Sequence, residues 1–317
     1  MKAERAERVA VIGAGIMGAG IAQVFAARGH RVVLQDVFEE ALTRAPETIR
    51  SNLTFLVEHG VYDAERIDAA VARVTTTPDL AAAARGAGFV VECVFEDLQL
   101  KQQVFEDLDE LCPPQTILAT NTSVMSIGEV GSRARHKERV IGTHFWNPPY
   151  LVPLVEVVRT ADTAPQVIEK TIALLRAVGK HPIDVKKDVP GFVANRLQHA
   201  LWREAFAIID RGIADAATVD ESIRYGFGLR LPVLGPIETA EMSGLDLVLS
   251  IHDYIFPFLD ASTEPSIVLR QKVEKGELGF KSGRGFRDWS PEEAQASRRR
   301  LMKHLVRMTK DMDEGER

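Results

Sequence analysis

The chain of 317 residues carries a formal net charge of −6, with 45% hydrophobic and 26% charged residues. This length and composition predict a globular protein with two domains, or one large domain, and a sizeable core. The acidic balance argues against nucleic acid or an anionic membrane surface as a partner, and no apolar run reaches membrane-spanning length.

Strands and helices alternate through the first half. The charged start MKAERAE leads straight into an apolar run, so we expect no signal peptide and a cytoplasmic protein. Strands are expected within RVAVIG, RVVLQD, GFVVECVF, TILATNTS, RVIGTHFW and PLVEVVR, with helices between most of them. This pattern predicts an α/β fold with a Rossmann-type, doubly wound parallel sheet. Cys93 and Cys112 lack metal-ligand spacing, and we expect neither a disulfide framework nor a metal.

Residues 39–72 are too long for one crossover helix. They hold two amphipathic patterns broken near EHGVYD, which indicate a helical hairpin inserted into the first domain. After HPIDVKKDVPGF the strand signal stops and the chain becomes helical. We therefore expect a first domain over residues 1–187 and an all-α domain over 188–317. Ser290 and Pro291 predict the start of a final helix, which we expect to dock on its own domain or on a dimer partner.

A nucleotide-binding fingerprint opens the chain. Gly13, Gly15 and Gly18 follow an expected strand and begin an expected helix, as in G-x-G-x-x-G. The phosphates of a dinucleotide would meet the free N–H groups of that helix. Asp36 ends the next strand, where it would accept from ribose hydroxyls and repel a 2′-phosphate, which favours NAD over NADP. FAD, or a glycine turn with no ligand, is a weaker interpretation.

The strand LVEVV contains a carboxylate, Glu156, where a buried side chain is expected. A buried carboxylate needs a partner, and His144 lies just upstream in GTHFWNPP. The pair could serve as a base and its orienting group, or it could be purely structural. Ser123 follows the strand TILAT at the ligand-binding edge, and Asn195 opens the second domain. From the residues alone, the favoured interpretation is that Ser123 is an ordinary turn residue and Asn195 an ordinary polar helix residue.

A family resemblance bears on these alternatives. The motifs ECVFEDLQLK, ATNTS, GTHFWNP, LVEVV, VPGFVANR and GFKSGRGF follow the glycine fingerprint in order. Together they resemble the L-3-hydroxyacyl-CoA dehydrogenase superfamily over nearly the whole chain. The resemblance implies NAD-dependent oxidation of a 3-hydroxy group to a 3-keto group, and a homodimer formed through the helical domain.

The same resemblance implies roles for individual residues. His144 would be the general base, Glu156 its orienting partner, and Ser123 and Asn195 would contact the substrate oxygen. Four residues would line the nicotinamide end, and Lys281 would close over the cofactor from the second domain. Those four residues are Glu96, Lys101, Ser123 and Asn147.

Two branches of the superfamily remain open. Thioester-using members usually carry a lysine-rich helical insert that suits the phosphates of coenzyme A. This insert has no lysine, and its seven acidic residues outnumber its three arginines. The motifs NPPYLVPLVEVV and GLRLPVLGPIET resemble the L-gulonate 3-dehydrogenase and lambda-crystallin branch, and free-acid dehydrogenases. We therefore favour a small free hydroxy acid, with a CoA thioester as the alternative and a non-catalytic crystallin-like protein as a remote one. Candidates to hold the free carboxylate are Arg196, Arg203, Arg224 and Arg230.

Overall fold

The computed structural model describes residues 8–315 and divides the chain into two compact units. Unit 1 runs to Asn195 and resumes at Leu301, whereas unit 2 comprises Arg196–Arg300. The start of the chain, on which our expectation of no signal peptide rests, lies partly outside the described residues. Within the described residues, no helix combines the length and apolar character needed to cross a membrane.

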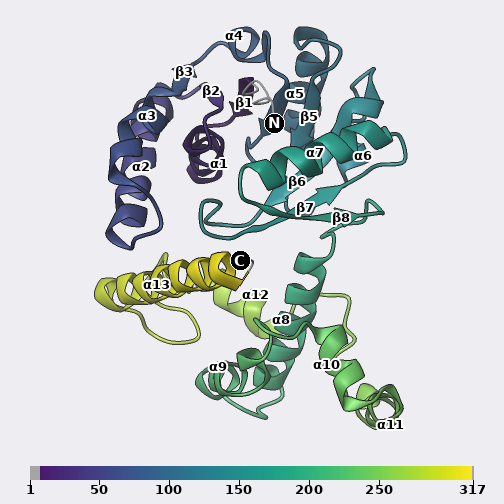
Figure 1. Ribbon diagram of the computed structural model, residues 1–317. Coiled ribbons are helices and arrows are strands. Elements are labelled where there is room, and N and C mark those ends of the chain that lie inside the picture. Colours follow the sequence, from purple (N-terminus) through teal and green to yellow (C-terminus); the bar gives the residue numbers. More distant parts are fainter. Residues whose placement is uncertain (1–7, 316–317) are drawn as a thin grey trace. The chain divides into compact units, whose positions relative to one another are not determined.

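Unit 1 is built on one sheet of eight strands in the order β3-β2-β1-β4-β5-β6-β7-β8 (Figure 1). The strands are β1 (Arg8–Ile12), β2 (Arg31–Gln35), β3 (Val74–Thr77), β4 (Phe89–Glu92), β5 (Ile117–Thr120), β6 (Val140–Phe145), β7 (Leu154–Val158) and β8 (His181–Val185). The sheet confirms the predicted Rossmann-type class. It adds β3, a threonine-rich strand that the sequence did not indicate.

We expected a parallel sheet, but one pair of neighbouring strands is antiparallel. Strand β7 pairs antiparallel with β6 and parallel with β8. The reason is the short segment 146–153 between β6 and β7, which holds no helix. A parallel connection needs a crossover of a dozen or more residues, so this shorter link reverses the chain.

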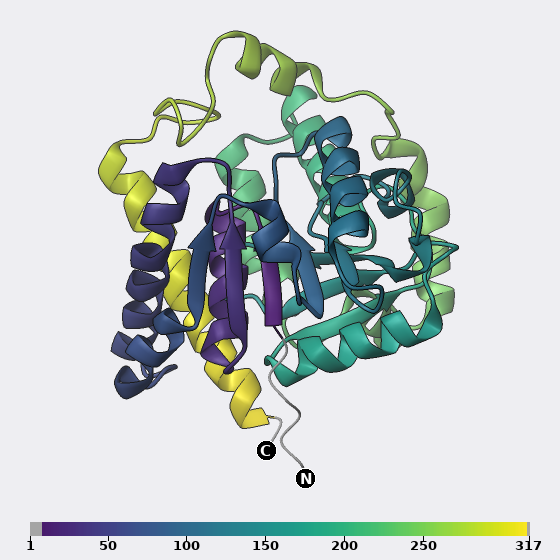
Figure 2. The same ribbon diagram turned by 90° about the horizontal axis from the view of Figure 1, so that it is seen from above.

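Helices cover both faces of the sheet (Figure 2). One core cluster joins the sheet to α1, α2 and α7, and the other joins it to α4, α5 and α6. The helices of this part are α1 (Ile16–Ala27), α2 (Glu39–Glu58), α3 (Ile67–Ala72), α4 (Leu80–Ala84), α5 (Leu98–Leu111), α6 (Ile127–Val130) and α7 (Pro165–Ala177), with 3-10 turns η1 (Ala64–Arg66) and η2 (Lys137–Arg139). Helices α2 and α3 form the hairpin predicted over residues 39–72.

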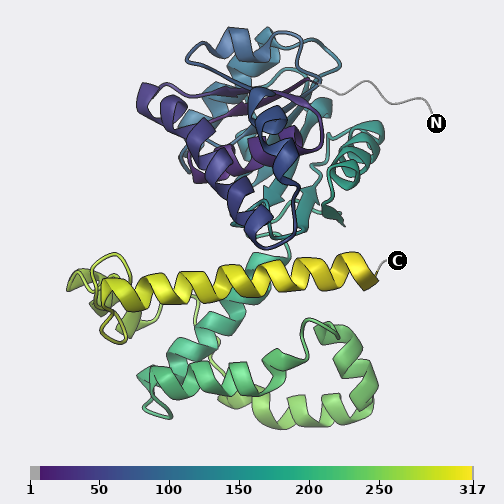
Figure 3. The same ribbon diagram turned by 60° about the vertical axis from the view of Figure 1, so that its left-hand side comes forward.

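Unit 2 is helical, as expected (Figure 3). Its elements are α8 (Ala194–Asp210), α9 (Ala216–Tyr225), η3 (Phe227–Leu229), α10 (Pro236–Ser243), α11 (Leu245–Ile255), η4 (Phe256–Phe258), α12 (Ile267–Glu274) and the first part of α13 (Pro291–Gly315). Among its hydrophobic side chains, only those of Ala207 and Ala294 are buried. The unit therefore leaves most of its apolar surface uncovered within one chain.

Helix α13 starts as its sequence predicts. The Ser290 hydroxyl accepts from the Glu293 amide at 3.1 Å, and the Glu293 carboxylate accepts from the Ser290 amide at 2.8 Å. We expected one helical domain from residue 188 to residue 317, but the part of α13 from Leu301 belongs to unit 1. The reason is its packing, because Val306 is buried in the core cluster that also contains α1 and α2. The sequence also predicts one apolar stripe on this helix, formed by Leu301, Leu305, Met308 and Met312. Leu305 packs against the same core cluster, and the side chain of Met312 lies outside the described residues.

Candidate active site

The glycine loop between β1 and α1 has the backbone geometry that its motif requires. Gly13 has a φ of +101°, and a Cβ added there would come within 2.6 Å of the Cys93 carbonyl oxygen. At Gly18 an added Cβ would lie 1.7 Å from the Gly13 oxygen, so only glycine lets α1 pack against the loop. Gly15, by contrast, faces open space next to the first turn of α1. That opening provides room for a pyrophosphate to approach the backbone.

Asp36 lies beside this loop, just after β2. Its carboxylate accepts from the Ala14 amide at 2.6 Å and from the Phe38 amide at 3.0 Å. Asp36 thus fixes the loop and remains partly exposed toward the site of the ribose. The N-terminus of α1 has no side-chain cap, so its N–H groups are available for phosphate oxygens. These features fit NAD, which would supply a hydride acceptor when bound.

The register of two neighbouring strands brings His144 and Glu156 together. They lie directly opposite each other in the antiparallel pair of β6 and β7. His144 Nδ1 and Glu156 Oε2 are 2.7 Å apart, and the two residues are 5% and 0% exposed. Because the carboxylate occupies Nδ1, the other ring nitrogen, Nε2, is left to exchange a proton with a ligand. The ring packs near Trp146 and Phe192, with centroids 5.4 and 5.8 Å away.

Glu156 is held by more than the histidine. Its Oε1 accepts from the Val193 amide at 3.0 Å and from the Ala194 amide at 2.9 Å, at the start of α8. Left-handed backbone at Gly191 and Phe192, with φ of 76° and 50°, precedes these amides. Burial pushes the pKa of Glu156 upward, but the bonds from His144, Ala194 and Val193 hold the pKa below its ordinary value. The carboxylate therefore stays charged and can stabilise a protonated His144.

The structure brings Ser123 and Asn195 into direct contact. The Asn195 side-chain amide donates to the Ser123 carbonyl oxygen at 2.8 Å. Glu96 holds the same turn, because its carboxylate accepts from the Ser123 amide at 3.0 Å and from the Thr122 hydroxyl. Ser123 itself is exposed, so its hydroxyl is accessible to a ligand at the carboxyl edge of β5.

Lys101 is enclosed rather than exposed to a ligand. It is 1% exposed, and its Nζ lies 2.8 Å from Glu92 Oε1 and 3.2 Å from Glu96 Oε2. Glu92, which the sequence motifs did not single out, is fully buried at the end of β4 and also accepts from the Thr120 hydroxyl. The sequence does contain a signal for this buried carboxylate, because Glu92 in FVVE interrupts an apolar strand just as Glu156 does in LVEVV. Through Glu96, this buried pair braces the turn that carries Ser123.

The remaining expected residues are Asn147 in unit 1 and five residues of unit 2. Asn147 is exposed in the segment after β6. Lys281 is exposed in unit 2, and its closure over the cofactor stays a prediction. All four candidate arginines also belong to unit 2. In that unit, the Arg203 guanidinium is 3.9 Å from the Asp260 carboxylate, and the Arg224 guanidinium is 3.0 Å from the Asp220 carboxylate.

Two family models cover most of the chain. The NAD-binding domain of 3-hydroxyacyl-CoA dehydrogenase matches residues 8–189, and the C-terminal domain of the same family matches residues 191–289. The chain belongs to the 3-hydroxyacyl-CoA dehydrogenase family. It is accordingly an NAD-dependent oxidoreductase of CH–OH groups, as the motifs implied. Helix α13 lies beyond both family models.

Relatives of this family member fall into both substrate classes. The 5-formyl-3-hydroxy-2-methylpyridine 4-carboxylate 5-dehydrogenase of Mesorhizobium japonicum is 36% identical over 301 residues, covering 94% of this chain and 96% of that protein. The 3-hydroxyadipyl-CoA dehydrogenase of Escherichia coli is 38% identical over 288 residues, covering 90% of this chain but 60% of that protein. A human lambda-crystallin homolog is 33% identical over 244 residues, covering 77% of this chain and 76% of that protein.

One solved structure resembles this chain over nearly the full length of both proteins. It is a 5-formyl-3-hydroxy-2-methylpyridine 4-carboxylic acid 5-dehydrogenase, described as an NAD+ dependent dismutase. Its TM-score is 0.90 at 33% identity, and the match covers 98% of this chain and 99% of that one. The similarity therefore extends through α13, beyond the two family domains.

Proposed function

We propose that this dehydrogenase oxidises a small free hydroxy acid, with His144 as the general base. His144 Nε2 would take the hydroxyl proton while the hydride leaves the same carbon for the nicotinamide, which forms the carbonyl product. Glu156 would hold the ring and balance its positive charge. Ser123 and Asn195 would steady the substrate oxygen. The observation that carries these roles is the 2.7 Å contact between His144 Nδ1 and the charged Glu156 carboxylate.

The preference for a free acid rests on two further observations. The solved dehydrogenase of a pyridine carboxylic acid matches the fold with a TM-score of 0.90, whereas solved enzymes named for acyl-CoA substrates, one of 3-hydroxybutyryl-CoA and one of 3-hydroxyacyl-CoA, match with TM-scores of 0.75 and 0.68. In addition, two of the three arginines of the helical insert are already paired. Arg44 lies 3.2 Å from Glu40, and Arg50 lies 2.7 Å from Asp68. Few charges on the insert are left for a polyanionic thioester.

A CoA thioester is the second candidate, favoured by the C-terminal family domain and by relatives named for acyl-CoA substrates. A non-catalytic role resembling that of a lens crystallin is disfavoured, because Ser123, His144, Glu156 and Asn195 are all present and the histidine is paired.

We also propose a homodimer formed through unit 2. Helix α11 buries no side chain in the single chain, although Leu247, Leu249 and Ile251 are 52%, 62% and 50% exposed. An apolar surface this extensive normally meets a partner. A cytoplasmic location stays a prediction from the sequence.

The substrate proposal is tested by NADH formation with NAD⁺ and two substrate panels. One panel contains 3-hydroxyacyl-CoA thioesters of rising chain length. The other contains L-gulonate, carnitine, 3-hydroxybutyrate and an aromatic hydroxymethyl carboxylate. We expect turnover of at least one free acid, with weaker turnover of the thioesters. Strong turnover of thioesters alone would overturn the free-acid assignment and leave the family reaction intact.

A further inference from the structure

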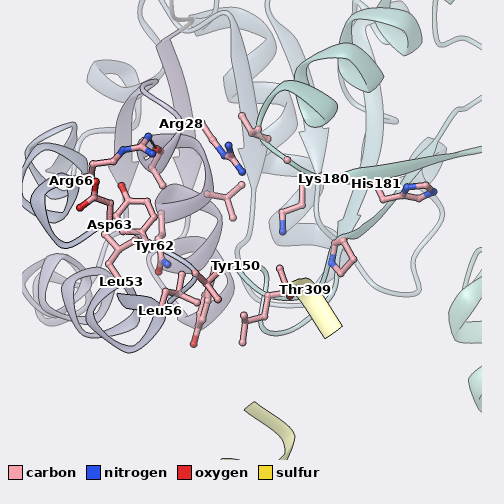
Figure 4. A pocket seen from close by; sticks show the side chains of 18 of the residues that line it. Arg28, Leu53, Leu56, Tyr62, Asp63, Arg66, Tyr150, Lys180, His181 and Thr309 are labelled. Atoms are coloured by element: carbon pink, nitrogen blue, oxygen red, sulfur yellow. Dashed lines mark hydrogen bonds between the residues drawn. The ribbon is translucent and has the colours of Figure 1, made fainter. Parts of the chain in front are cut away.

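A cavity of about 760 Å³ lies in unit 1, apart from the residues assigned above (Figure 4). Its walls come from α1, α2, the turn before α3, the segment before β7, the end of α7, the start of β8, and α13. It shares no residue with the glycine loop or with the pair of His144 and Glu156. Its volume falls within the range of small-molecule sites.

The cavity is strongly cationic in an acidic protein. Its lining contains four arginine and lysine side chains and one histidine, against a single carboxylate. These residues are Arg28, Arg66, Arg176, Lys180, His181 and Asp63. Figure 4 shows Arg28 and Lys180 extending toward the same space, with Arg66 and Asp63 across from them. The excess of positive charge calls for an anion.

Lys180 is the most constrained of these cations. It is 9% exposed, and its Nζ donates to the carbonyl oxygens of Pro149 and, at 3.0 Å, Val152. Two acceptors leave one ammonium N–H for a further partner. The Arg28 guanidinium lies over neighbouring Gly179, where an added Cβ would come within 2.7 Å of Arg28 Nη2. Burial, and then the charge of Arg28, lower the pKa of Lys180 to about 8.

The rest of the wall is apolar and aromatic. Leu53, Leu56 and Tyr150 line it, together with Tyr62, whose buried hydroxyl has no hydrogen-bond partner among the described residues. The Arg66 guanidinium lies 5.4 Å from the centre of the Tyr62 ring. Such a wall suits a ligand with an apolar body and a group that can bond the Tyr62 hydroxyl.

We propose that this cavity binds a small organic polyanion, with phosphate or carboxylate groups on an apolar body. Because Lys180 also holds two carbonyls of segment 146–153, which joins the strands of His144 and Glu156, the ligand acts as an effector of the catalytic segment. Binding engages the third N–H of Lys180 and the guanidinium of Arg28, and it offsets their mutual repulsion. The effector role rests on the proposed function, whereas the binding site does not.

Calorimetric titration of the full chain, saturated with NADH so that the glycine loop is filled, tests the site. The probes are pyrophosphate, citrate, inorganic phosphate and phenyl phosphate. We expect one site per chain, tighter binding of phenyl phosphate than of inorganic phosphate, and a preference between pyrophosphate and citrate that distinguishes the two anion classes. The double variant Arg28→Gln/Arg176→Gln should weaken binding about tenfold or more, whereas Arg85→Gln, an exposed arginine outside the cavity, should leave it unchanged.

Proton uptake provides an independent test. Above pH 8 the free enzyme loses the Lys180 charge, so anion binding should draw a proton from the buffer and weaken as pH rises. Titrations at pH 8.5 in two buffers of different ionisation enthalpy measure that uptake, and Lys180→Met should abolish it. No binding at millimolar concentrations of any probe, or equal losses in Arg85→Gln and the double variant, would overturn the proposal. The double variant keeps the test valid if Lys180→Met fails to fold.

The effector role has its own readout. An effector probe should change the KM or kcat of the substrate that the two panels identify, and the double variant should lose that response while keeping its basal activity. Binding without any kinetic response would overturn the effector role alone. A failure of both substrate panels would count against the proposed function, and the binding result would still decide the site.

Discussion

Glu92 and Glu156 are both fully buried at strand positions, but they are neutralised in different ways. Glu92 faces Lys101, a permanent cation, and burial raises its pKa even though Lys101 pulls the pKa down. Glu156 faces His144 and two amides at the start of α8, and these bonds hold its pKa low. The first pair braces a turn, whereas the second can take up and release a proton. Whether a buried carboxylate has a structural or a catalytic role therefore depends on the side chain paired with it.

The largest expected effect is the loss of catalytic rate when His144, the residue that exchanges protons, is replaced. His144→Ala should lower kcat about 10³-fold, because general base catalysis contributes at this scale. NADH affinity should stay near that of the unmodified enzyme, since His144 is absent from the glycine loop. Steady-state kinetics and NADH fluorescence titration measure the two quantities. Full turnover in a variant that binds NADH would remove His144 from the reaction.

Replacing the orienting carboxylate should have a smaller effect on rate. Glu156→Gln keeps an acceptor for the amides of Val193 and Ala194, but it loses the charge that stabilises protonated His144. We expect kcat to fall about 10²-fold, the lower end of what general base catalysis contributes, with little change in KM. Glu169→Gln serves as the matched control, because it makes the same replacement at an exposed glutamate on α7. An equal loss of kcat in both variants would contradict the orienting role.

Changes to the pair of Glu92 and Lys101 should affect the free energy of unfolding. Lys101→Met leaves the Glu92 charge buried without its cation, which should lower the free energy of unfolding by about 3 kcal/mol. The double variant Lys101→Met/Glu92→Gln should recover part of that loss, because no buried charge remains. Urea denaturation of the full chain, followed by tryptophan fluorescence, gives the comparison. A double variant less stable than Lys101→Met would show that the buried charge is not the cause.

The smallest effect is the pH dependence of stability. A carboxylate with a lowered pKa stabilises the fold above its unfolded pKa of about 4.3, and this contribution disappears as pH falls through the folded value. The stability difference between the unmodified protein and Glu156→Gln should therefore shrink below about pH 4. Urea denaturation at pH 7 and pH 3.5 measures it. A difference that grows in acid would contradict the lowered pKa.

The sequence predicted the elements whose signals are local. The glycine fingerprint, the helical hairpin and the Ser290 cap each depend on neighbouring residues, and each was found. The pairing of His144 with Glu156 was also predicted, because a buried carboxylate must find a partner. Strand β3 was missed, since VTTT is short and follows a helix without an apolar alternation.

Features that depend on distant packing were harder to predict. The reversal of β7 could have been inferred from the short segment 146–153, but the sequence pattern of LVEVV is the same in either direction. Enclosure of Lys101 depends on Glu92 and Glu96 folding over it, which no local pattern encodes. The docking of α13 on unit 1 was predicted only in part, because Leu305 of the predicted apolar stripe packs against the core cluster, whereas the buried residue, Val306, lies outside that stripe.

The pH dependence of hydride transfer tests the central claim most directly. Single-turnover NADH formation is followed with saturating NAD⁺ and a substrate that the panels identify, for the unmodified enzyme and for Glu156→Gln. If His144 removes the hydroxyl proton, the rate should fall as the medium becomes acidic, because a protonated imidazole accepts no proton, and Glu156→Gln should alter the profile. A rate that stays constant into acid, with the same profile in both proteins, would contradict catalysis by this pair.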